Sequence, residues 1–154
     1  MIHKLLWVYI LSLLPTFEGR YALLVGISLG LNPLSSFLSA SMGVLTLSLI
    51  LPVLLPHIDR IMMYLSNRKG YLSKVARVYL RYVGNVRKRS SKYIEKWGFL
   101  GLIIFVAIPL PATGIWTGSI AAYVFGLRKV KAIPALLLGG MISNVITITP
   151  ILMS

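Results

Sequence analysis

Long apolar runs, separated by one polar stretch, dominate the hydrophobic pattern of the chain. There are four of them, at residues 5–31, 34–56, 98–127 and 132–153. The second and fourth runs contain no charged residue. Each is longer than the ~20 helical residues that cross a hydrocarbon core of about 30 Å. These two runs are therefore predicted to be transmembrane helices.

The first and third runs are each interrupted at their centre by residues that break helices. Pro15 and Gly19 interrupt the first run, and Pro109, Pro111 and Gly114 interrupt the third. A proline inside a helix removes a hydrogen bond and clashes with the preceding turn. Each half is then about 13 residues, or roughly 20 Å of helix, which is too short to cross. Each run is either a kinked span or a re-entrant hairpin that returns to its own side.

The basic residues favour the re-entrant alternative. The chain has 16 Lys and Arg against three acids, and eleven of the 16 lie between residues 60 and 96. If both broken runs are re-entrant, Arg128, Lys129 and Lys131 join this segment on one side of the membrane. Because cytoplasmic loops carry an excess of Lys and Arg, we expect residues 57–97 to be cytoplasmic and both termini to lie outside. The expected location is the plasma membrane, with several passes.

An internal repeat also supports this topology. A shift of 96 residues pairs Pro15 with Pro111, Gly30 with Gly126, Leu31 with Leu127 and Gly43 with Gly139. The same shift superimposes two ladders of small residues at a spacing of four, Ala22/Gly26/Gly30 and Gly118/Ala122/Gly126. Hairpin plus span, repeated in inverted topology, is an architecture of secondary transporters. We predict one all-α integral membrane domain, 1–154, made of repeat 4–56, connector 57–97 and repeat 98–154.

The connector has an amphipathic pattern. Its apolar positions recur at helical spacing, at Leu72, Val75, Ala76, Tyr79, Leu80 and Val83. Most of its basic residues fall off this stripe, so it is either a helix on the anionic cytoplasmic leaflet or a solvated connector that sets orientation. Turns are expected at its ends, at residues 67–70 and 88–91.

Glu18 and Arg20 are the leading candidates for function, because an ionisable residue deep in a membrane segment costs on the order of 3 kcal/mol. Residues two apart share a side in extended backbone, so pairing of these two would fit an unwound break. Arg20 stays charged and is the expected anion contact. Glu18 is the expected proton carrier, because burial favours its neutral form. The alternative is a buried pair that only locks the hairpin.

The second break offers polar groups without charge, at Thr113, Gly114, Trp116 and Thr117. Thr113 is predicted to be the N-cap of the outgoing half-helix. Half-helices that begin near Gly19 and Gly114 would direct two positive N-terminal ends to the middle of the membrane. Together with Arg20 they would form a site for a phosphate or carboxylate. Asn144, in the last span, could bond across helices or line the pathway.

Other chemistries are poorly supported. The chain has no cysteine, and its two histidines, His3 and His57, lack a third ligand at metal spacing, so neither a metal nor another cofactor is expected. Paired-carboxylate, Walker and serine-triad motifs are missing from the sequence, so an enzyme is not expected. Because the basic residues flank membrane spans, nucleic acid is not an expected partner either.

The second break carries a family resemblance. The segment FVAIPLPATGIWTG, residues 105–118, resembles the hallmark of the small multidrug export family, with Ala112 where glycine is usual. The first break, LPTFEGRYA at residues 14–22, is similar to that family's first motif. More distantly, hairpin plus span resembles the DedA/VTT superfamily, whose members are linked to movement of polyprenyl phosphates or phospholipids between leaflets. That resemblance implies that Glu18 and Arg20 match its re-entrant acidic and basic residues.

Our hypothesis from the sequence is a small secondary transporter or lipid translocase. It would move an anionic amphiphile, similar to a polyprenyl phosphate or a phospholipid, through a midplane site and could be coupled to protons. One alternative is a multidrug exporter of amphipathic compounds, and another is a non-transporting membrane scaffold. A homodimer is expected, because the small-residue ladders would suit close helix packing.

Overall fold

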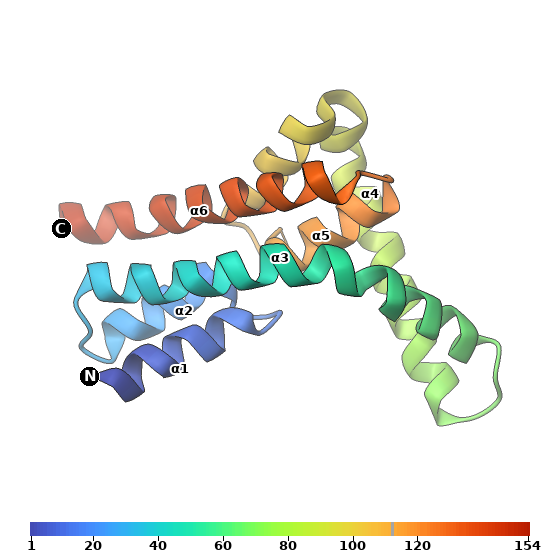
Figure 1. Cartoon of the computed structure of the whole chain (residues 1–154), viewed down its shortest axis with the longest axis horizontal. Helices are drawn as coiled ribbons and strands as arrows, with labels where there is room; N and C mark the ends of the chain where they lie inside the picture. Colours follow the sequence, from blue (N-terminus) through green and yellow to red (C-terminus); the bar gives the residue numbers. More distant parts are fainter. Residues whose placement is uncertain (112) are drawn as a thin grey trace.

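The computed structural model describes residues 1–111 and 113–154; Ala112 lies outside the described residues. The described residues are all-helical and form six α-helices (Figure 1). They are α1 (Ile2–Leu13), α2 (Glu18–Ser28), α3 (Pro33–Ser66), α4 (Tyr71–Ala107), α5 (Ile115–Val124) and α6 (Lys129–Met153).

Two long apolar helices, α3 and α6, pack at the centre of the fold. Among the described residues, α3 and α6 are the helices that are long and apolar enough to cross a membrane, with 34 and 25 residues. They pack against each other side by side and run in opposite directions (Figure 1). Asn32 caps α3, since its side-chain oxygen accepts a hydrogen bond from the Leu34 amide at 3.0 Å. Helix α3 continues ten residues beyond the predicted end at Pro56, into the start of the connector.

The first broken run folds as a helical hairpin of α1 and α2. The two arms have 12 and 11 residues, which makes each about 18 Å long. They pack together, and the Lys4 ammonium donates a hydrogen bond to the Leu29 carbonyl at 2.6 Å, which ties the open end. The backbone turns at residues 14–17, where Pro15 ends the first arm. The break predicted from the sequence is therefore present.

Helix α4 combines the connector with the first arm of the second hairpin. Gly98 interrupts it with φ +52° and ψ −118°, a kink that divides the connector from residues 99–107. The turn at residues 67–70 is present, but the turn predicted at 88–91 is wrong, because α4 runs through it. Val86, Ser90 and Ile94 continue a buried stripe across this segment. That stripe and good helix formers such as Lys88 and Arg89 keep the segment helical.

The second broken run also folds as a hairpin, made of the end of α4 and the ten-residue α5. The C-terminal ends of α2 and α5 are alike at the level of single hydrogen bonds. Gly30 and Gly126 both have positive φ, +81° and +68°. The amide of Leu31 donates to Gly26 at 3.1 Å, and the amide of Leu127 donates to Ala122 at 2.9 Å. These are two copies of one glycine C-cap, 96 residues apart.

Small residues bring the helices together within the chain. A Cβ atom on Gly43 of α3 would overlap the Ser12 hydroxyl of α1, and one on Gly139 of α6 would lie 2.8 Å from Val106 Cβ of α4. At the ladder positions Gly26 and Gly118, a Cβ atom would likewise overlap side chains of the same chain. The ladders therefore no longer argue for a homodimer, which stays a prediction.

Candidate functional site

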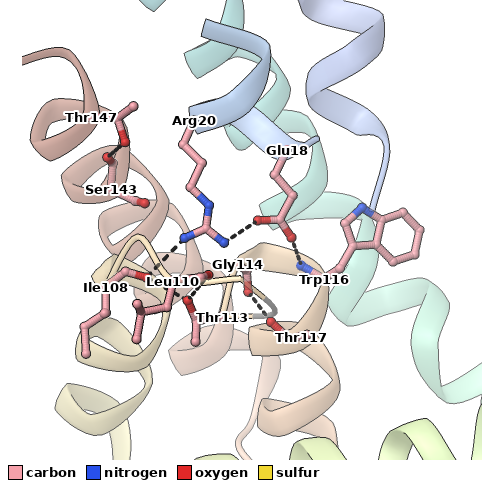
Figure 2. Close-up of polar contacts among 10 residues, drawn as sticks. All are labelled: Glu18, Arg20, Ile108, Leu110, Thr113, Gly114, Trp116, Thr117, Ser143 and Thr147. Carbon is pink, nitrogen blue, oxygen red and sulfur yellow. Dashed lines mark hydrogen bonds and ion pairs between the residues drawn. The ribbon is translucent and has the colours of Figure 1, made fainter. Parts of the chain in front are cut away.

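The two breaks meet at one place in the fold. Figure 2 shows Arg20, at the start of α2, directed toward Ile108 and Glu18 directed toward Trp116. Arg20 Nη1 donates a hydrogen bond to the Ile108 carbonyl at 3.1 Å. The Trp116 amide donates to Glu18 Oε1 at 3.3 Å. Residues about 90 positions apart in the sequence thus form one polar cluster.

Glu18 and Arg20 are an ion pair within that cluster. Arg20 Nη2 lies 3.5 Å from Glu18 Oε2, and the two side chains are only 5% and 8% exposed. The predicted pairing is present, but the extended backbone invoked for it is wrong. Both residues belong to the first turn of α2, and Glu18 has φ +50°, a left-handed conformation that is uncommon for a residue with a side chain.

The Glu18 carboxylate also occupies the N-terminus of α5. It fills the space in which Gly114 would carry a Cβ atom, and it accepts the Trp116 amide of the first turn. Because a helix N-terminus carries partial positive charge, an anion is stabilised there. In this structure the protein's own Glu18 carboxylate occupies this helix N-terminus, and the site for a substrate phosphate or carboxylate stays a prediction.

Thr113 does not cap α5, so that prediction is wrong; the N-cap residue is Gly114, without a side-chain cap. The Thr113 hydroxyl lies 2.7 Å from the carbonyls of both Ile108 and Leu110 and bonds within the turn (Figure 2). Helix α4 ends at Ala107, and Ile108, which precedes Pro109, has an extended backbone, so these carbonyls have no helical partner. Thr113 thus stabilises the tip itself.

Trp116 and Thr117 hold the start of α5 in different ways. The Trp116 indole donates from Nε1 to the Leu13 carbonyl at 3.1 Å, which joins α5 to the end of α1. The Thr117 hydroxyl donates to the Gly114 carbonyl at 3.0 Å. Trp116 is therefore a second link between the two tips, whereas Thr117 bonds within its own helix.

Helix α6 closes the back of the cluster. Asn144 is 1% exposed, and its amide would lie within 3.0 Å of a Cβ atom on Gly19. In the described part of the chain, the Asn144 amide nitrogen and Arg20 Nε have no hydrogen-bond partner. Both residues line a small void of about 10 Å³ behind the ion pair. Asn144 thus lies beside the tips, and its predicted place on a pathway stays a prediction.

A larger cavity opens in front of the ion pair. It has a volume of about 620 Å³, which is within the range of small-molecule sites. Glu18, Arg20 and Thr117 supply its polar groups. Its other walls come from Pro15, Thr16, Phe17, Tyr21, Leu24, Val25, Tyr82 and Pro111. The cavity is therefore mostly apolar, with charged groups on one wall.

Two contributions were missed at the level of sequence. Tyr82 of α4 lines the cavity, although the connector pattern gives no sign that this residue reaches the breaks. Asp59, three residues beyond the second apolar run, is 7% exposed and accepts a hydrogen bond from the Tyr123 hydroxyl at 3.0 Å. Burial and the neighbouring Asp59 carboxylate raise the pKa of Tyr79 to about 12. Asp59 therefore joins α3 to both α4 and α5.

The fold and site together define a class: a small all-helical protein with two apolar helices long enough to cross a membrane and two helical hairpins whose tips line one cavity. Residues 18–146 match the family described as "Putative small multi-drug export protein", so the chain belongs to this family. The match covers α2 to α5 and most of α6, so it includes Glu18, Arg20 and the second break but not Pro15, and the description indicates a transport role. No curated protein and no solved structure matches the chain significantly.

Proposed function

We propose that this protein exports amphipathic compounds across the membrane and that the cavity between the two hairpin tips binds them. The observation that carries the proposal is the cavity of about 620 Å³ with mostly apolar walls and a buried ion pair on one side. Apolar pockets with a few fixed polar groups are typical binding sites for small molecules. The aromatic residues Phe17, Tyr21 and Tyr82 would contact the apolar body of the compound, and Glu18 and Arg20 its polar end.

The proposed topology has α3 and α6 as spans and both hairpins as re-entrant elements related by an inverted repeat. The N- and C-termini lie at one end of the molecule, and the kinked helix α4 and the α5–α6 turn lie toward the other (Figure 1). Arms of about 18 Å are too short to cross a core of about 30 Å. The positive-inside rule then places residues 57–97 in the cytoplasm, along the anionic leaflet.

Single-cysteine labelling tests this topology without background, because the chain has no native cysteine. In intact cells, a membrane-impermeant maleimide should label Ile2→Cys and Ser154→Cys from outside. It should label Lys69→Cys only after permeabilisation. Labelling of both terminal variants from the cytoplasmic side alone would restore the model with four full spans.

Filling the cavity tests the site. Leu24 lines it and is 38% exposed, so Leu24→Trp would occupy binding volume without disturbing the buried ion pair. Leu38→Trp is the matched control, because Leu38 is 57% exposed on α3 and does not line the cavity. Export of an amphipathic dye from proteoliposomes should fall for Leu24→Trp and stay normal for Leu38→Trp. Equal rates for the two variants would refute the cavity as the binding site.

An anionic amphiphile, such as a polyprenyl phosphate or a phospholipid, is the second candidate substrate. It is favoured by one observation: Arg20 and the N-terminus of α5 already hold a carboxylate, that of Glu18. A proton on Glu18 would weaken both contacts, and Arg20 and the Trp116 amide could then accept the substrate's anionic group. Proton binding and anion binding would be coupled by this exchange.

Movement of a fluorescent phosphate lipid between leaflets under a pH gradient tests the exchange. Glu18→Gln mimics the neutral acid, so it should keep lipid movement but remove its response to the gradient. A normal pH response in this variant would rule out Glu18 as the proton carrier. The third hypothesis, a non-transporting scaffold, required a packed ion pair and no cavity at the breaks; the pair is packed, but the cavity is present.

A further inference from the structure

A second cavity lies beside the one described above and has a different chemical character. Its volume is about 480 Å³, and three cations from α4 line it: Lys88, Arg89 and Lys92. The opposite wall consists of Tyr93 and Phe105 of α4 and of Leu110, Pro111 and Thr113 at the second tip. We refer to this cavity, defined by those eight residues, as the basic vestibule.

The cations of the basic vestibule form one cluster. Residues at positions 88, 89 and 92 lie within about one helical turn, and those four apart are neighbours on the helix surface. In the described part of the chain, the ion pair within 4.0 Å is that of Glu18 with Arg20, and none involves these three side chains. All three side chains are exposed. They are therefore available to an external anion.

The inner part of the basic vestibule is apolar and aromatic. Phe105 is 2% exposed, and its ring centroid lies 5.9 Å from that of Tyr93. The Lys92 ammonium lies 5.0 Å from the centroid of the Tyr93 ring. Leu110 is half-exposed at the tip and adds apolar surface. A ligand that satisfies both parts has an anionic head group and an apolar body.

The basic vestibule also borders the cavity at the ion pair. Pro111 lines both cavities, so they meet on its two sides. Burial raises the pKa of the Tyr82 phenol, the Glu18 carboxylate raises it further, and the Arg89 guanidinium lowers it. Tyr82, a wall of the first cavity, is thus within electrostatic reach of Arg89 in the second. The two cavities are therefore neighbours at Pro111.

We propose that the basic vestibule is a capture site for amphiphiles with a phosphate monoester head group, which Lys88, Arg89 and Lys92 bind while Phe105 and Leu110 contact the apolar chain. Arg and Lys are the side chains that best complement phosphate, Arg through paired N–H groups. The proposal rests on the proposed function, because the captured amphiphile would then enter the cavity at Glu18 and Arg20. In this proposal the three cations of the basic vestibule bind the anionic head group, and Arg20, whose charge Glu18 neutralises, does not.

Direct binding of dioctanoyl phosphatidic acid to the purified full-length protein in detergent tests the site. The triple variant Lys88→Gln/Arg89→Gln/Lys92→Gln should bind at least about tenfold more weakly, because three charge-assisted contacts are lost. The matched control Lys69→Gln/Lys74→Gln/Arg77→Gln removes the same charge around the start of α4, where those residues line a separate hollow. The control should bind like the unmodified protein, and an equal loss in both variants would overturn the proposal.

Three further outcomes distinguish the ligand. Dioctanoyl phosphatidylcholine, whose phosphate is a diester with a choline group, should bind more weakly than the monoester. If inorganic phosphate binds as tightly as the lipid, the basic vestibule is a site for free anions and the amphiphile assignment is overturned. Leu110→Asn should weaken lipid binding and leave phosphate binding unchanged. The binding assay needs no transport, so it stays readable if dye export fails.

Discussion

The two hairpins have the same outline but supply opposite halves of the site. Both end in the same glycine C-cap, and both are followed by a long helix that starts 96 residues apart, at Pro33 and Lys129. The first tip contributes charged side chains, whereas the described residues of the second contribute backbone groups, a glycine and an indole. Arg20 donates to a carbonyl of the second tip, and Glu18 accepts from an amide of it.

This difference explains why the first tip can carry both charges, Glu18 and Arg20. A buried ion pair is costly unless further hydrogen bonds satisfy it. The broken second hairpin provides them, since its unwound backbone leaves the Ile108 carbonyl and the Trp116 amide free of helical partners. The charged tip therefore depends on the uncharged one.

The largest expected effect comes from leaving one charge alone. Arg20→Met would leave the Glu18 carboxylate buried without its partner, at a cost of about 3–5 kcal/mol in the free energy of unfolding. The double variant Glu18→Gln/Arg20→Met should recover part of that loss. Unfolding by SDS titration in mixed micelles measures both. Wild-type stability in the single variant would show that the pair does not hold the tips.

A smaller effect is expected at the uncharged tip. Gly114→Ala places a methyl group where the Glu18 carboxylate lies, which would displace it and break the bond from the Trp116 amide. Dye export should fall about tenfold or more, the equivalent of one charge-assisted hydrogen bond. Gly84→Ala is the control, because a Cβ atom there meets nothing within 4 Å. Similar export by the two variants would contradict the assigned geometry.

The second link between the tips is weaker. Trp116→Phe keeps the ring but removes the N–H group that bonds the Leu13 carbonyl, and it should cost about 1 kcal/mol of stability. Trp97→Phe, on the connector, is the comparison, since its indole is 53% exposed. The same SDS titration should separate the two variants. An equal loss of stability in Trp97→Phe would show that the hydrogen bond from the Trp116 indole to the Leu13 carbonyl contributes no stability of its own.

The shared C-caps give the smallest effect and the most direct comparison of the two halves. Gly30→Ala and Gly126→Ala each force a side chain into positive φ, and each should cost about 1 kcal/mol. Because the two sites are distant, the losses should add in the double variant. A neutral result at one glycine and a full loss at the other would show that the two hairpins are not equivalent.

Much of the fold could be predicted from local signals. Prolines and glycines at the centres of apolar runs predicted both breaks. The shift of 96 residues paired Gly30 with Gly126, which the structure shows at two C-caps of one pattern. The connector helix was visible from its apolar stripe, but its continuation through residues 88–91 was not. Charged and serine residues suggested a turn there, whereas the buried positions Val86, Ser90 and Ile94 keep it helical.

The site could be predicted only as a set of residue types. Burial cost identified Glu18 and Arg20, but nothing local shows that Glu18 adopts positive φ and fills the N-terminus of α5. The residue type of Thr113 predicts a capping role, whereas its hydroxyl bonds to carbonyls that the end of α4 at Ala107 leaves without helical partners. Tyr82 enters through packing between distant segments, which no single-sequence pattern encodes.

Protection of one cysteine tests the central claim, that the cavity between the tips binds the exported compound. Thr16 lines the cavity and is exposed, and the protein has no native cysteine, so Thr16→Cys would carry its one thiol. In proteoliposomes, an exported dye should slow maleimide labelling of Thr16→Cys and leave Ser154→Cys unaffected, provided that Thr16→Cys still exports the dye. Undiminished labelling of Thr16→Cys at dye concentrations that saturate export would contradict the account.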